Sequence, residues 1–147
     1  MYKRQLYICS REIAGDMIVL YGDTITDIDF KKMINFHRNT STPATVSVYQ
    51  LKSNFGLFDV SNTNRVVKYE EKPHLDKWIN IGYFYFDKEI LKYLNEYKSF
   101  ELYLNFLMRS NLISAFKHKG IHITVNTMGE LTEASNNIHK IKKNYEK

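Results

Sequence analysis

A short apolar run that ends abruptly in glycine and aspartate is the feature that most constrains the fold of this chain. Residues 17–21 read Met-Ile-Val-Leu-Tyr, and Gly22 and Asp23 follow directly. A continuous apolar run of this length indicates a strand buried on both faces in a parallel sheet. Ligands gather beyond the carboxyl ends of strands in open α/β sheets, so Asp23 is predicted to lie at the mouth of a crevice. Taken alone, a Gly-Asp pair is also typical of a simple turn.

The rest of the chain alternates strand-like and helix-like segments, which predicts an α/β fold. Helices are predicted near residues 30–37, 88–94, 99–108 and 127–145. Strands are predicted near residues 44–48, 55–60, 65–70, 80–86, 112–116 and 121–125. Asp27 or Asp29 can cap the first helix, and Thr127 and Glu130 have the spacing of a capping box before the last. The turn-forming residues 61–64 predict a hairpin between two of the strands.

Composition bounds the chain to one soluble globular unit. At 147 residues and 44% hydrophobic content, it is long enough for one core and too short for two ordinary domains. The single cysteine, Cys9, excludes an intramolecular disulfide and favours a reducing cytoplasm. The apolar runs are too short to span a bilayer, so no membrane partner is expected.

Charge alone does not identify a partner. The formal net charge of +5 is compatible with nucleic acid, anionic membrane or phosphorylated small molecules. The lysines are scattered, apart from a group near the carboxyl terminus that is typical of a solvated helix face. That group consists of Lys140, Lys142, Lys143 and Lys147. We therefore do not expect nucleic acid as a partner, although a basic nucleic-acid-binding domain remains an alternative.

Four motifs occur in an order that carries a resemblance. They are GDT at residues 22–24, FG at 55–56, EEKP at 70–73 and WINIG at 78–82. In this order, and across residues 16–138, the chain resembles the sugar-1-phosphate nucleotidyltransferase family. The resemblance implies a Rossmann-like, GT-A-like mixed sheet with flanking helices. It also implies transfer of a nucleotidyl group from an NTP to a sugar 1-phosphate, which yields an NDP-sugar and pyrophosphate.

The resemblance also assigns roles to residues in these motifs. Asp23 would be a catalytic ligand of Mg²⁺, a cation that prefers oxygen donors. Lys72 would be catalytic and would face the phosphate of the sugar 1-phosphate. The implied substrate-binding residues are Gly22, Gly56, Glu71, Lys72, Asn80 and Gly82. Outside the motif, Glu71 and Lys72 would be interpreted as an exposed ion pair.

Two departures from the family pattern modify this expectation. The glycine-rich G-x-G-T-R loop of the family's N-terminal segment is absent, so residues 1–147 are interpreted as a single partial domain that lacks the first β-α unit. Residues 1–15 are interpreted as a candidate leader, non-native or disordered. Asn126 stands where the family often has an aspartate that binds metal, and it would be a neutral second ligand of Mg²⁺.

The sequence therefore predicts an enzyme of which this chain supplies the sugar-phosphate and metal side. Activity of the isolated chain is not expected, because the triphosphate loop is absent. A non-catalytic relative that binds a nucleotide sugar, or acts as a regulatory subunit, is the main alternative. The base and the sugar stay open, and an oligomer is compatible with the sequence.

Overall fold

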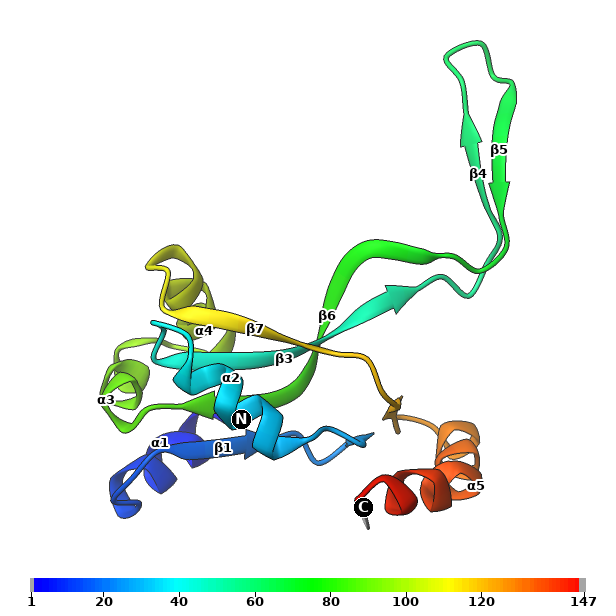
Figure 1. The fold of residues 1–147 in the computed structure, drawn as a ribbon. Coiled ribbons are helices and arrows are strands. Elements are labelled where there is room, and N and C mark those ends of the chain that lie inside the picture. The colour runs from blue at the N-terminus through cyan, green and yellow to red at the C-terminus, as the bar shows by residue number, and fades with distance from the viewer. Residues whose placement is uncertain (1, 146–147) are drawn as a thin grey trace.

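The centre of the protein is a four-stranded mixed sheet, seen here in a computed structural model that describes residues 2–145. The strand order is β1-β6-β3-β7. The strands are β1 (Met17–Leu20), β3 (Ala44–Lys52), β6 (His74–Phe86) and β7 (Ile113–His118). Strand β6 runs antiparallel to both β1 and β3, whereas β3 and β7 are parallel. The α/β class with a mixed sheet, expected from the sequence, is confirmed (Figure 1).

Helices flank this sheet, and two small strand pairs lie outside it. The helices are α1 (Tyr2–Glu12), α2 (Phe30–Arg38), α3 (Lys88–Leu91), the 3₁₀ helix η1 (Lys92–Glu96), α4 (Phe100–Arg109) and α5 (Met128–Tyr145). The antiparallel pairs are β2 (Thr24–Thr26) with β8 (His122–Thr124), and β4 (Leu57–Val60) with β5 (Val66–Glu70). Among the helices of residues 2–145, none is long and apolar enough to cross a membrane.

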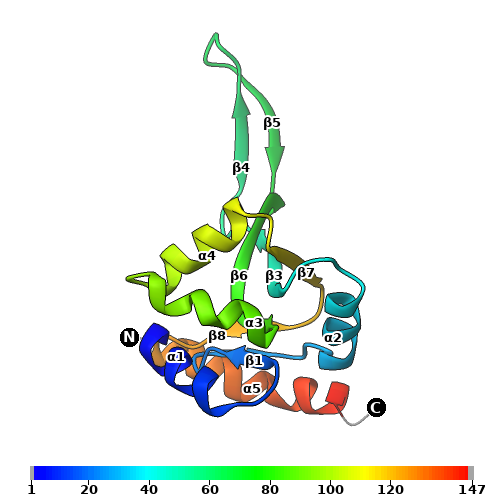
Figure 2. The same ribbon diagram turned by 90° about the vertical axis from the view of Figure 1, so that its left-hand side faces the viewer.

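The core lies on both faces of the sheet because alternate residues of β6 point to opposite sides. Phe84 and Phe86 pack on one face, together with apolar residues of α1, α3 and α4 such as Leu107. Ile81 and Tyr83 pack on the other face, against Met33 of α2 and its neighbours. Figure 2 shows α1, α3 and α4 on one side of the sheet and α2 on the other.

The predicted helix caps are present where the sequence places them. The Asp29 carboxylate accepts a hydrogen bond from the main-chain N–H of Lys32 at 3.0 Å and caps α2. At α4, the Ser99 hydroxyl accepts from the N–H of Leu102 at 3.2 Å. Each cap satisfies a donor that the first turn of a helix leaves unpaired. These contacts fix where the helices begin.

Strand β1 is confirmed, but its predicted environment is wrong. It was expected to be buried on both faces in a parallel sheet, and it is instead an edge strand, antiparallel to β6. Its side chains alternate between the core and solvent, with Met17 7% exposed and Leu20 50% exposed. The reason is that β1 has one strand neighbour in the described part of the chain. An apolar run alone does not specify how many neighbours a strand has.

The two chain ends bear on the sequence expectations in different ways. Within the candidate leader, residues 2–12 form helix α1, and Leu6 lies in the core at 8% exposure. This part of the segment is thus packed against the sheet, and its origin stays a hypothesis. At the other end, the predicted last helix is confirmed as α5. The side chains of the four grouped lysines at residues 140–147 lie outside the described residues.

The predicted hairpin is confirmed and projects from the body of the protein (Figures 1 and 2). Its turn is closed by a hydrogen bond from the N–H of Ser61 to the C=O of Arg65 at 2.8 Å. Every residue of β4 and β5 is exposed, including Phe58 at 60% and Val67 at 66%. The hairpin therefore forms an arm that adds little to the core.

Candidate functional site

Asp23 and Asn126 lie at adjacent strand ends. The main-chain N–H of Val125 donates to the C=O of Asp23 at 2.8 Å. This bond continues the register of β2 and β8, in which Thr24 faces Thr124. The next residue, Asn126, is exposed, as is Asp23. The two predicted metal ligands come from distant parts of the sequence, and the fold brings their backbones together.

The position of Asn126 is fixed by a carboxylate that the sequence identified only as a cap. Glu130 accepts from the main-chain N–H of Asn126 at 2.8 Å and from that of Thr127 at 2.9 Å. In return, the N–H of Glu130 donates to the Thr127 hydroxyl at 3.2 Å, which completes the predicted capping box. The hydrogen bond from Asn126 holds the pKa of Glu130 below its ordinary value. Glu130 thus positions the segment that presents Asn126.

Gly82 and Asn80 lie beside the strand that leads to Asp23. The N–H of Tyr21 donates to the C=O of Gly82 at 2.9 Å. Gly82 has a φ of +78°, a left-handed conformation that favours glycine. The Asn80 side-chain oxygen accepts from the N–H of Gly82 at 2.8 Å. With this oxygen engaged, the NH₂ group of Asn80 is the part suited to donate to a ligand.

Gly56, Glu71 and Lys72 form a second group at the base of the β4–β5 arm. A Cβ added to Gly56 would lie 2.6 Å from the hydroxyl of Tyr69 and 2.9 Å from Oε2 of Glu71. Tyr69 donates its hydroxyl hydrogen to Glu71, and this bond raises the pKa of Tyr69. Lys72 has a φ of +46°, the left-handed region in which a residue with a Cβ is strained. The sequence gave no indication of Tyr69.

These two groups do not share one pocket in the structure. Strand β6 runs continuously from His74 to Phe86 and joins the arm to the sheet. Because a strand rises about 3.3 Å per residue, the six steps from His74 to Asn80 span roughly 20 Å. Figure 1 shows the arm directed away from the end of β1. The structure therefore brings Asp23, Asn126 and Gly82 into one region and places Lys72 in another.

A pocket beside Asp23 contains two lysines that the sequence analysis did not single out. It is lined by Lys3, Tyr21, Asp23, Lys98, Ser99, Phe100 and Glu101. Lys3 comes from α1, and its ammonium donates to the C=O of Tyr97 at 2.5 Å. Lys98 immediately precedes the amino terminus of α4. Cations and a helix amino terminus both favour anions, so this pocket suits a phosphate group near Asp23. No motif in the sequence joins Lys3 to Asp23.

The residues at this site offer oxygen donors for a hard cation. Within residues 2–145, no group of three or more His, Cys, Asp or Glu side chains is arranged to hold a metal ion. Asp23 and Asn126 supply a carboxylate and an amide oxygen from neighbouring strand ends. Mg²⁺ commonly takes one or two protein oxygens and completes its shell with water and substrate phosphates. The donor set fits Mg²⁺ bound in that manner.

Comparison with known proteins agrees with this arrangement. The profile of the nucleotidyl transferase family matches residues 5–119. A protein of Sulfolobus acidocaldarius described as a candidate mannose-1-phosphate guanyltransferase is 27% identical over 118 residues, which cover 77% of this chain and 33% of that protein. A glucose-1-phosphate adenylyltransferase of Desulforamulus reducens is 33% identical over 87 residues, which cover 54% of this chain and 22% of that protein.

A solved structure also shares the fold. A protein of Bacillus anthracis described as a candidate glucose-1-phosphate thymidylyltransferase, crystallised with sucrose, superposes with a TM-score of 0.66. Its sequence is 19% identical, and the alignment covers 91% of this chain and 59% of that one. The GT-A-like nucleotidyltransferase fold expected from the resemblance is thus confirmed. The chain spans about a third or less of the length of the two curated relatives.

Proposed function

Because this chain belongs to the nucleotidyl transferase family, we propose that it is part of an enzyme that joins a nucleoside triphosphate to a sugar 1-phosphate. The products are an NDP-sugar and pyrophosphate. The observation that carries the proposal is the hydrogen bond of 2.8 Å from the N–H of Val125 to the C=O of Asp23. It sets Asp23 beside Asn126 at an exposed edge, next to a pocket that contains Lys3 and Lys98.

In the proposed reaction, an oxygen of the sugar phosphate attacks the α-phosphorus of the nucleotide in line with the leaving group. One P–O bond forms, the bond between the α-phosphorus and the bridging oxygen breaks, and pyrophosphate departs with that oxygen. No covalent intermediate with the protein is needed. The protein therefore acts by positioning its substrates and by stabilising charge.

The residues of this chain divide this work. Asp23 and Asn126 would hold Mg²⁺, which supplies positive charge to bridge the phosphates when bound. The NH₂ group of Asn80 would donate to a sugar hydroxyl, while the backbone near Gly82 allows close approach. Lys98, beside Asp23, would offset phosphate charge. Glu71 and Lys72 keep the sugar-phosphate roles that the resemblance implies, and their separation from Asp23 requires the arm to approach the sheet.

The metal part of the proposal can be tested on the chain itself. Mn²⁺ replaces Mg²⁺ at oxygen sites and broadens nearby NMR signals because it is paramagnetic. We expect micromolar Mn²⁺ to broaden the amide signals of residues 22–24 and 125–127 in ¹⁵N-labelled protein, and excess Mg²⁺ to restore them. Asp23→Asn should abolish the effect, whereas Asp59→Asn on the arm should leave it unchanged. Broadening centred elsewhere would contradict the metal assignment.

The separation of Lys72 from Asp23 favours one second candidate, a module that binds a nucleotide sugar without turnover. The two candidates differ in their products. A protein completed with the upstream segment of a family member should release pyrophosphate from NTP and sugar 1-phosphate if the enzyme proposal is right. Saturable binding of NDP-glucose without pyrophosphate release would favour the second candidate. A cytoplasmic location belongs to either proposal, because Cys9 is a free, exposed thiol.

A further inference from the structure

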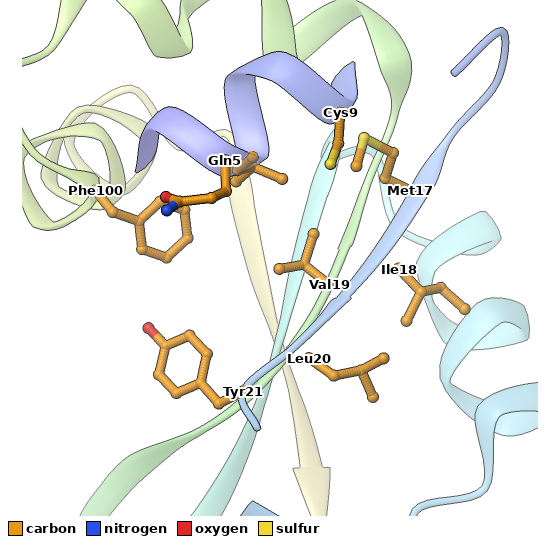
Figure 3. A pocket seen from close by; sticks show the side chains of 9 residues that line it. Gln5, Cys9, Met17, Ile18, Val19, Leu20, Tyr21 and Phe100 are labelled. Carbon is orange, nitrogen blue, oxygen red and sulfur yellow. The ribbon is translucent and has the colours of Figure 1, made fainter. Parts of the chain in front are cut away.

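The outer edge of β1 carries features that go beyond the proposed catalytic role. Strand β1 closes one side of the sheet, and its only strand partner within residues 2–145 is β6. Ile18 and Leu20 are 38% and 50% exposed, although an exposed edge strand in a soluble protein is usually protected by charge. Figure 3 shows both side chains pointing away from α1, while Met17, Val19 and Tyr21 lie on the side of the helices.

The register of β1 determines which backbone groups face outward. The N–H of Tyr21 donates to the C=O of its partner Gly82, so Tyr21 is a hydrogen-bonded position of the antiparallel pair. Hydrogen-bonded positions alternate in such a pair. Val19 therefore also bonds to β6, whereas the N–H and C=O groups of Ile18 and Leu20 point toward the open edge. Two donors and two acceptors are thus presented in a row.

This row is complementary to itself. When two copies of β1 meet antiparallel about a two-fold axis at Val19, Ile18 of each copy faces Leu20 of the other. Each such pair can exchange two N–H to C=O hydrogen bonds, which gives four bonds across the axis. The apolar side chains of each pair also meet on the same face of the combined sheet.

The charge around the edge favours a second copy as the occupant. The groove along β1 is lined by Gln5, Leu6, Cys9, the residues from Met17 to Tyr21, and Phe100, none of which is charged. The chain as a whole has a formal net charge of +5. Two copies that meet elsewhere would face like charges, whereas this patch lets them approach without such contacts.

We propose that two copies of this chain associate through their β1 edges and form one continuous eight-stranded sheet. Asp23 lies four residues beyond the axis at Val19. At about 3.3 Å per residue, the two Asp23 sites would be roughly 26 Å apart and independent of the contact. The contact involves a short strand, so we expect a weak dimer with a dissociation constant on the order of 10 µM.

The first test is sedimentation of the purified chain across concentrations from about 1 to 300 µM, chosen to bracket the expected dissociation constant. We expect a monomer–dimer equilibrium, and Ile18→Lys should weaken it at least tenfold because it places like charges across the axis. Val67→Lys, on the arm and 66% exposed, is the matched control and should leave association unchanged. Both changes are at exposed positions, and equal melting temperatures would verify that the fold is retained.

The second test reads the register directly. The two Val19 residues would form a pair without hydrogen bonds, with Cα atoms about 4.5 Å apart, which suits a disulfide. In a Cys9→Ser background, Val19→Cys should therefore form a disulfide-linked dimer in mild oxidant, whereas Val46→Cys in the central strand β3 should not. A chain that stays monomeric throughout the range, or a dimer lost in Val67→Lys and kept in Ile18→Lys, would overturn the proposal.

Discussion

The ring of Tyr21 occupies the space that any side chain at position 82 would need. A Cβ built on Gly82 would lie 2.5 Å from both Cγ and Cδ2 of Tyr21, and the φ of Gly82 is +78°. The glycine thus allows β6 to pass close to the strand that ends in Asp23. Steric exclusion and backbone conformation act together at this point, so it is a sensitive probe of the site.

Gly82→Ala should destabilise the protein by about 3 kcal/mol. The left-handed conformation costs an alanine about 1–2 kcal/mol, and overpacking against Tyr21 adds a similar amount. Chemical denaturation followed by circular dichroism would measure the loss. Gly15→Ala is the control, because an added Cβ there meets no atom within 4 Å. If Gly82→Ala/Tyr21→Ala is not more stable than Gly82→Ala, the steric explanation is wrong.

Lys72→Gly should separate ligand binding from folding. The left-handed φ of +46° strains lysine and suits glycine, so the free energy of unfolding should stay the same or rise by up to about 1 kcal/mol. Loss of the ammonium should weaken binding of glucose 1-phosphate or mannose 1-phosphate, measured by calorimetry, about tenfold. Lys68→Ala removes a charge from the same arm and should not affect binding. Unchanged affinity in Lys72→Gly would remove Lys72 from the site.

Asn126→Asp should strengthen divalent metal binding several-fold, because a carboxylate adds negative charge next to Asp23. The Mg²⁺ concentration needed to displace Mn²⁺, followed by relaxation of water protons, would measure the change. Asn105→Asp, an exposed site on α4, has the same change of charge and should have no effect. Equal Mg²⁺ affinity in the Asn126 variant and the unmodified chain would argue against position 126 as a ligand.

Glu130 predicts a dependence of stability on pH. Its pKa lies below the ordinary value of 4.5, chiefly because its carboxylate accepts the hydrogen bond from Asn126. A carboxylate with a depressed pKa stabilises the folded state above its unfolded pKa, and this contribution disappears as the pH falls through the folded pKa. Unfolding between pH 3 and 7 should therefore show a steeper decline below 4.5 in the unmodified chain than in Glu130→Gln. Parallel curves would contradict the role of Glu130.

Much of the local structure could be predicted because the signals lie within a few residues of each other. Asp29 and Ser99 cap helices through hydrogen bonds that reach three residues forward. The box of Thr127 and Glu130 has the same short range. The hairpin turn at residues 61–64 is likewise encoded by its own composition. Local hydrogen bonding and backbone preference determine these features before any tertiary contact forms.

The candidate site could be predicted only in part. Asp23 and Asn126 were identified by resemblance, and the pairing of β2 with β8 places them at neighbouring strand ends. Lys3 and Lys98 were missed, because no sequence pattern relates them to Asp23. The expected proximity of Lys72 to Asp23 is absent, because extended strand β6 separates the arm from the sheet. Motif order along a chain specifies which residues matter and does not specify their distances.

The sequence by itself determined the α/β class, the helix boundaries and the strand that ends at Asp23, because periodicity and capping act over short distances. Tertiary structure alone decided that β1 lies at an edge, that Glu130 holds the segment of Asn126 and that Lys98 lies near Asp23. Those outcomes depend on which segments pair across the sheet. Such pairings join residues that are distant in sequence, and no local preference encodes them.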